Sequence, residues 1–301
     1  MSAAESEPAQ AARARGLRVG PVLLTLPAGV AMLVFFVAPI AIFVVYSFLT
    51  AQLYDVSRPF TLGAYRSALD SELNRTLARN SIEIGLLSAL CSVALALPVA
   101  YWLRYATGRW RMIVLFLITA SMFASYLVRI YAWRTMLGDH GVVNSALQSL
   151  GLTDHPLGFL IFNRFAVTVA LVHIFLPYAV LVLFAGFQPI RPGLLEAAQD
   201  LGAGAYLRWR RVILPLVAAP SLSAFLFVFV LSASDYVTPQ FVGGTSGVML
   251  GVQVQANFTT VGNYPLGAAT SLLMLAAFVG LYFAMRLGLR LARLEDRKSV
   301  V

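Results

Sequence analysis

Residues 196–215 read EAAQDLGAGAYLRWRRVILP and separate two long apolar stretches of a 301-residue chain. Just upstream, Pro192 suits the first turn of a helix, because its missing N–H costs nothing there. Leucine and alanine side chains then recur at helical spacing, and Gly202 can end the helix in a left-handed conformation. The stretch predicts a short amphipathic helix over 193–202 and a second amphipathic piece over 205–211 that leads into the next apolar run.

A helix this short is only marginally stable alone in water, so it requires a surface to rest on. One interpretation places it flat on the membrane surface. The other docks it into a groove on a partner protein. Glu196 and Asp200 are acidic and would be repelled by anionic lipid, whereas a basic groove would attract them. The charges therefore favour a partner protein.

The composition on either side of this stretch indicates a membrane protein. The chain is 59% hydrophobic and only 12% charged, against roughly 45–50% and about 25% in globular domains. A transmembrane helix needs about 20 mostly apolar residues. Six such spans are predicted, and the first is read as an uncleaved anchor because its apolar run is too long for a secretory signal. The spans are 21–49, 80–103, 112–137, 165–188, 212–234 and 266–289.

The distribution of arginine and lysine over the loops predicts the orientation. Fifteen basic residues fall in one alternate set of loops and tails, and five fall in the opposite set. Because basic residues concentrate on the cytoplasmic side, we expect the tails 1–20 and 291–301 and the 190–211 loop to be cytoplasmic. The net charge of +9 is explained by this topology. No basic soluble face remains that would indicate nucleic-acid binding.

Residues that would carry catalysis or hold a cofactor are scarce. Cys91 is the single cysteine, and Lys298, the single lysine, follows no glycine-rich phosphate loop. The three histidines, at positions 140, 155 and 173, form no HExxH or other ligand pattern, and no GxSxG nucleophile elbow occurs. The sequence therefore predicts no metal site and no catalysis in this chain. Any ATP that drives it must be hydrolysed by another subunit.

The opening stretch also follows a spaced pattern: an EAA triplet, three residues, a glycine, nine residues, an aliphatic residue, one further residue, and LP. The residues that carry it are Glu196, Ala197, Ala198, Gly202, Val212, Leu214 and Pro215. This pattern resembles the EAA loop of type I ABC-importer permeases, with valine where isoleucine is usual. The resemblance implies an all-α polytopic membrane protein with six transmembrane helices of that permease fold, with a core domain at 75–290.

The resemblance further implies a function and a set of partners. The loop at 190–215 would couple the permease to a dimer of ABC ATPase subunits, which bind ATP and Mg²⁺, so that no cofactor resides in this chain. A second permease subunit, an extracytoplasmic solute-binding protein and membrane lipid would complete the assembly in a bacterial inner membrane. The coupling residues implied are Glu196, Ala197, Ala198, Asp200, Gly202, Leu214 and Pro215.

A narrower resemblance concerns the transported solute. Residues 232–244 read SASDYVTPQFVGG and 264–269 read YPLGAA, and both are similar to segments of the spermidine/putrescine permeases. Permeases for ferric iron, thiosulfate or sulfate, or amino-acid-like ligands share part of these motifs and remain alternatives, as does an ion-driven secondary transporter. The candidates for the substrate path are Asp235, Tyr236, Glu83 and Tyr264.

Several polar residues in or near the spans have two readings. Asp235 is expected at the outer rim, either facing substrate or as a helix-end residue exposed to water, and Glu83 either faces substrate or favours a helix N-terminus. Arg129 and Arg134 are expected to reach the outer interface as anchors. His173 either bonds a carbonyl freed by the nearby proline or lines the path.

Overall fold

The computed structural model describes residues 21–52, 55–57, 60–106 and 108–291, so the predicted N-terminal tail and residues 292–301 of the C-terminal tail lie outside the described residues. This part is helical apart from one antiparallel hairpin, β1 (Thr50–Gln52) with β2 (Asp55–Ser57). The α-helices are α1 (Pro21–Ser47), α2 (Gly63–Asp70), α3 (Glu72–Tyr105), α4 (Arg111–Met122), α5 (Tyr126–Leu137), α6 (Val142–Ser149), α7 (Arg164–Phe187), α8 (Pro192–Asp200), α9 (Ala205–Arg208), α10 (Leu214–Ala233), α11 (Val237–Val242), α12 (Leu250–Thr259) and α13 (Tyr264–Leu291).

The core of the molecule is a three-helix group of α3, α7 and α10, which pack closely on one another. Small residues make this possible, because they let helix backbones approach. A Cβ added at Gly85 of α3 would lie 2.8 Å from the Cβ of Ala233 on α10. Ser88, Ala89 and Ala96 of α3 are fully buried. An all-α membrane fold is thus confirmed.

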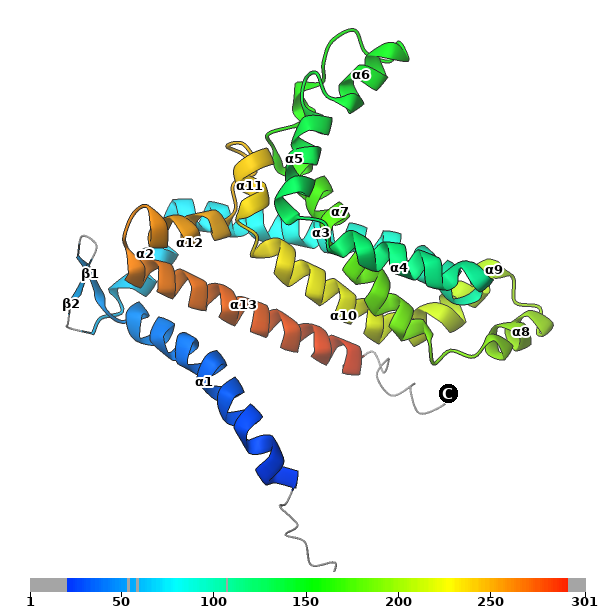
Figure 1. The fold of residues 1–301 in the computed structure, drawn as a ribbon, viewed down its shortest axis with the longest axis horizontal. Coiled ribbons are helices and arrows are strands. Elements are labelled where there is room, and N and C mark those ends of the chain that lie inside the picture. The colour runs from blue at the N-terminus through cyan, green and yellow to red at the C-terminus, as the bar shows by residue number, and fades with distance from the viewer. Residues whose placement is uncertain (1–20, 53–54, 58–59, 107, 292–301) are drawn as a thin grey trace, which may run out of the picture.

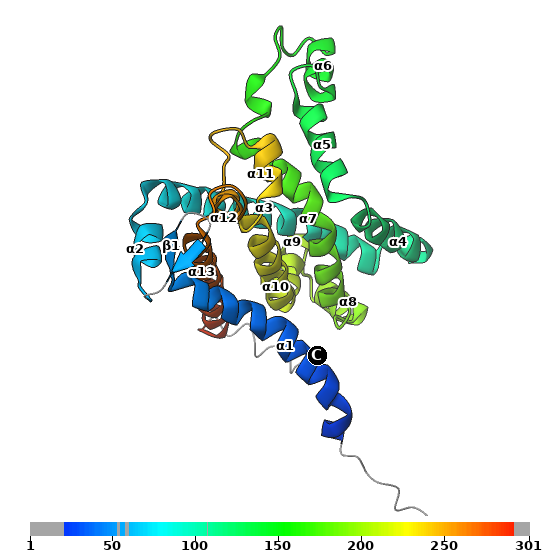
Figure 2. The ribbon, with the colours of Figure 1, turned by 60° about the vertical axis from the view of Figure 1, so that its left-hand side comes forward.

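Five of the predicted spans are confirmed as helices long and apolar enough to cross a membrane. The third predicted span, 112–137, is not one straight helix, and it completes the six only as a broken span. There the chain forms α4 and α5, which meet at a 90° bend around residues 123–125. Ser125 has extended backbone angles, and the Ser121 hydroxyl bonds the carbonyl of Ile118 inside α4. Figures 1 and 2 show α5 and α6 projecting from the helical body.

The short segments gather at two opposite ends of the core helices. α8 and α9 lie at one end, which we call the α8 end (residues 188–213), and α2, α11 and α12 lie toward the other, which we call the α12 end (Figure 1). α1 packs along α13 near the α12 end, where the rings of Phe43 and Phe258 are 5.5 Å apart. The α12 end is also where α3 and α13 begin.

Candidate functional site

Ile190, which precedes α8, is hydrogen-bonded to the C-terminus of α3. The Arg104 guanidinium donates from Nη2 to the carbonyl of Ile190 at 3.4 Å, and the Tyr105 hydroxyl donates to the same oxygen at 3.3 Å. Ile190 itself is buried. The exit from α7 therefore moves together with the last turn of α3.

The short helix predicted over 193–202 is confirmed as α8, which begins at Pro192 and ends at Asp200. Gly202 has a φ of +81°, as expected for a residue that ends the helix in a left-handed conformation. Its N–H donates to the carbonyl of Gln199 at 2.8 Å, and the next N–H, from Ala203, donates to Ala198 at 3.0 Å. These bonds turn the chain sharply toward α9.

The surface of α8 is largely unused by the rest of the chain. Leu195 is its single buried residue, whereas Glu196 and Asp200 are exposed and form no ion pair within the described residues. Leu201 is 88% exposed and Tyr206 is 73% exposed. Two acids and two large apolar side chains thus face outward on a segment that stands apart from the core (Figure 1).

The link from α8 back to the core is compact. Arg208 donates to the Gln199 side chain at 2.9 Å, which ties α9 to α8. The chain then forms a π-helix over Trp209–Ile213, with the Trp209 ring 5.0 Å from that of Tyr101 on α3. This π-helix was not among the sequence-based predictions. Pro215, which has no N–H to complete the α-helical bond to the carbonyl four residues earlier, is the signal that could have indicated it.

At the α12 end, Glu83 is held in an ion-pair network. Its carboxylate contacts the Arg79 guanidinium at 2.6 Å and also that of Arg164 on α7. Arg164 in turn donates to the carbonyl of Ser246 at 3.1 Å, and Asn80 donates to Val248 at 2.8 Å. Glu83 therefore joins α3 to α7 and, through Arg164, to the segment before α12. The expectation of a helix N-terminus at Glu83 is wrong, because α3 begins eleven residues earlier, at Glu72. The ion pairs give Glu83 a structural role of another kind, and its contact with substrate stays a prediction.

The expectation that Asp235 is a helix-end residue exposed to water is wrong, whereas its place in the substrate path stays a prediction. Only 9% of the residue is exposed. Its carboxylate accepts hydrogen bonds from the Tyr126 hydroxyl at 2.8 Å and from the N–H groups of Val237 at 3.0 Å and Thr238 at 3.2 Å. The placement by helix length failed because α10 ends at Ala233 and the chain folds at once into α11. Asp235 thereby holds the start of α5 against α11.

Tyr236 and Tyr264 have different surroundings. Tyr236 is 44% exposed and lines a pocket of about 350 Å³ with Gln255 and Ser271. Tyr264 is half-buried, and its ring lies 6.2 Å from Phe258 and 6.5 Å from Tyr46, which ties α1, α12 and α13 together. The four candidates for a substrate path thus have different surroundings, and Tyr236 lines a pocket.

Arg129 is half-buried against α7, and its expected role as an interface anchor stays a prediction. Its Nη1 lies 3.4 Å from the carbonyl of Ile174, ten residues into α7, because the bend after α4 turns α5 across that helix. Arg134 lies over the Phe162 ring, 6.0 Å from its centroid. Within the described residues the His173 ring makes no hydrogen bond, so the predicted bond to a carbonyl freed by Pro177 is absent.

His173 instead packs against Trp133, with ring centroids 5.6 Å apart, and is exposed. Both line an open groove of about 670 Å³ between α3, α5 and α7. Most other lining residues are apolar, among them Leu87 and Leu95 of α3. In the described part of the chain no three metal-ligating side chains come together.

Comparison with known proteins gives a consistent result. The profile of the family described as "binding-protein-dependent transport system inner membrane component" matches residues 84–293. The chain is 31% identical over 217 residues to the spermidine/putrescine transport system permease protein PotB of Escherichia coli. The aligned residues make up 72% of this chain and 78% of PotB. The chain is 31% identical over 250 residues to the inner membrane ABC transporter permease protein YdcU of the same organism, covering 78% of each.

A solved structure shares the fold. A chain of a bacterial ABC transporter involved in the import of the acidic polysaccharide alginate superposes with a TM-score of 0.70 at 17% identity, covering 89% of this chain and 94% of that chain. A second structure of the alginate transporter, in complex with an alginate pentasaccharide-bound periplasmic protein, gives a TM-score of 0.67 at 19% identity, covering 89% and 93%.

Proposed function

Because the chain belongs to the binding-protein-dependent inner-membrane transport components, as a type I ABC-importer permease, we propose that it is one of two permease subunits of an importer for polyamines such as spermidine and putrescine. Its place in a multi-pass inner-membrane transport system follows from the family and from the apolar helices. The polyamine assignment is supported by PotB and its counterpart in Haemophilus influenzae, which is 28% identical over 83% of this chain.

The observation that carries the proposal is the exposed surface of α8. It offers Glu196, Asp200 and Leu201 to a partner, while the described chain supplies nothing that covers them. We assign α8 to a cleft in the ATPase dimer, which binds ATP and Mg²⁺. The small side chains of Ala197 and Ala198 allow a close approach of the partner to α8. Gly202 forms the turn after α8, and Leu214 and Pro215 begin α10. In this arrangement α8 and both termini face the cytoplasm.

Movement of α8 reaches the membrane helices through short, fixed contacts. The Arg104 and Tyr105 bonds connect its base to α3, and Trp209 connects its end to the same helix through Tyr101. ATP-driven closure of the partner subunits therefore tilts α3, α7 and α10 together. A change of this kind alternates the access of the substrate path between the two sides of the membrane.

The second permease subunit would cover the groove of α3, α5 and α7. His173 lies nine residues into α7, near the middle of the span, and a polar ring without a hydrogen bond is costly against lipid. The His173 ring would gain a hydrogen bond from a second permease, related to this one but encoded separately, or from a water-filled path beside it. The solute-binding protein would deliver substrate at the α12 end.

In the substrate path, Tyr236 is the residue best placed to meet an amine, because its ring lines an open pocket and cations bind aromatic faces. Glu83, Asp235 and Tyr264 would act around it mainly by holding the path in shape. Ferric iron, thiosulfate or sulfate, and amino-acid-like ligands are the competing solutes. An ion-driven secondary transporter is set aside by the family, although one span is broken.

The test uses the full importer in proteoliposomes, with its ATPase, second permease and binding protein, and follows labelled spermidine. Glu196→Lys should reduce uptake on the order of 30-fold or more, since a reversed charge at a docking surface costs about 2 kcal/mol or more. Gly202→Asp should also reduce uptake, because the φ of +81° at this turn favours glycine. Membrane insertion should be unchanged. Asp139→Lys, the same charge change at an exposed residue outside α8, is the matched control.

Two outcomes separate the parts of this proposal. Normal uptake by both variants would reject the role of α8. Wild-type ATPase activity that responds to binding protein loaded with another solute, and not to binding protein loaded with spermidine, would reject the polyamine assignment and leave the coupling role intact.

A further inference from the structure

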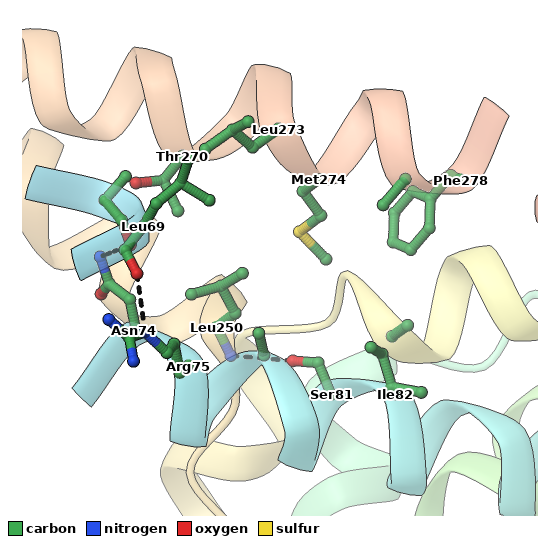
Figure 3. A pocket seen from close by; sticks show the side chains of 14 residues that line it. Leu69, Asn74, Arg75, Ser81, Ile82, Leu250, Thr270, Leu273, Met274 and Phe278 are labelled. Carbon is green, nitrogen blue, oxygen red and sulfur yellow. Dashed lines mark hydrogen bonds between the residues drawn. The ribbon is translucent and has the colours of Figure 1, made fainter. Parts of the chain in front are cut away.

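A narrow groove separates α13 from α3 near the α12 end. α13 packs chiefly on α1, α2 and α12, and the space between it and α3 has a volume of about 180 Å³. Figure 3 shows α13 above this space and α3 below it. The wall consists mainly of apolar side chains, including Leu69, Ile82, Leu250, Leu273, Met274 and Phe278.

The few polar side chains in the wall are occupied by the protein itself. Asn74 donates to the carbonyl of Ala68 at 3.2 Å, and Thr270 donates to that of Leu266 at 2.7 Å. The Ser81 hydroxyl accepts the N–H of Leu250 at 2.9 Å. The part of any ligand that enters this groove must therefore be apolar, since a polar group would find no partner there.

The rim of the groove carries one exposed guanidinium, that of Arg75. Its Nε donates to the carbonyl of Leu69 at 2.8 Å and its Nη2 to that of Asp70 at 3.0 Å, so the group is fixed in position (Figure 3). Among the described residues no carboxylate forms an ion pair with it. Arg75 is thus an oriented cation with donors left for an anion, and guanidinium groups match phosphate oxygens well.

The Arg75 guanidinium and the apolar wall lie at different depths along the helices, and this arrangement matches one class of membrane molecule. Arg75 lies in the first turn of α3, whereas Phe278 lies fourteen residues into α13, or about 21 Å at 1.5 Å per residue. The cation therefore sits where the spanning helices begin, and the apolar groove runs from it toward the middle of the membrane. A second protein helix, about 10 Å wide, does not fit a groove of this volume.

We propose that this groove binds an anionic phospholipid, with one acyl chain between α3 and α13 and the phosphate on Arg75. The lipid would fill the gap between the core and the α1–α13 pair and so stabilise that pair against the core. The proposal does not depend on which solute the protein transports.

The test is native mass spectrometry of the purified full-length chain with phosphatidylglycerol, compared with phosphatidylcholine. Wild type should retain one phosphatidylglycerol at least about tenfold more tightly than Arg75→Gln, since hydrogen bonds to charged groups are stronger than those between neutral groups. Arg66→Gln removes an exposed arginine of α2 that does not line the groove and should behave as wild type.

The acyl chain is tested separately. Ala78→Phe, and Ala277→Phe on the exposed side of α13 should the first variant not fold, should displace the chain and lower retention as Arg75→Gln does. A photoreactive acyl chain on phosphatidylglycerol should crosslink within residues 270–278. Equal losses in Arg75→Gln and Arg66→Gln, equal retention of phosphatidylcholine, or crosslinks only elsewhere would overturn the proposal.

Discussion

Two pairs of candidate acidic residues, one at each end of the molecule, have opposite surroundings. At the α8 end, Glu196 and Asp200 are exposed and form no ion pair within the described residues. At the α12 end, Glu83 and Asp235 are engaged by the chain itself, one by two arginines and the other by a tyrosine and two backbone N–H groups. On α8 the free charges fit a surface for a partner, because Leu201 is exposed beside them, whereas the engaged charges of Glu83 and Asp235 hold helices of the chain together.

Asp235→Ala is the variant for which we expect the largest loss of stability. This change leaves the N–H groups of Val237 and Thr238 without their side-chain acceptor in a buried place, while the Tyr126 hydroxyl keeps only the Thr238 hydroxyl at 3.0 Å. We therefore expect a loss of about 2–4 kcal/mol in the free energy of unfolding. Thermal unfolding of the purified importer would measure it as a lower Tm. Glu196→Ala is the contrasting variant and should leave the Tm unchanged while uptake falls. Equal Tm values for the two variants would contradict the comparison.

Much of the α8 end could be predicted from the sequence, because its signals are local. The proline that opens α8 and the glycine that ends it are separated by only nine residues, and each has a backbone preference that needs no tertiary contact. The long apolar runs similarly indicated five of the spans. Each of these features is decided by residues close together along the chain.

The α12 end and the broken span could not be predicted in this way. Residues 121–125 read SMFAS, without proline or glycine, so apolar composition gives no sign of the 90° bend. Asp235 is buried by Tyr126, which lies 109 positions away, and Glu83 pairs with Arg164, 81 positions away. Contacts over such separations depend on how the helices pack, which helical spacing alone does not determine.

Tyr236 differs from Asp235 within the α12 end. It is the next residue in sequence, yet it lines the pocket with Gln255 instead of holding helices together. If an amine passes over its ring, Tyr236→Ala removes an attraction of about 0.5–2 kcal/mol and should lower spermidine uptake about 2- to 30-fold at saturating binding protein. Tyr236→Phe keeps the ring and should retain most of the uptake. Equal uptake by Phe and Ala variants would show that the ring face is not used.

The smallest effect is expected for Glu83→Gln, because a half-exposed network in contact with water contributes little and is screened by salt. Glutamine still accepts hydrogen bonds from Arg79 and Arg164, so the Tm should fall slightly at low ionic strength and match wild type in about 1 M salt, where the Debye length is about 3 Å. Glu72→Gln, an exposed acid of α3 outside the described ion pairs, is the control. Since Glu83 links α3 to α7, spermidine uptake should follow the Tm in its dependence on salt. Loss of uptake at every salt concentration with an unchanged Tm would instead place Glu83 in direct contact with the solute.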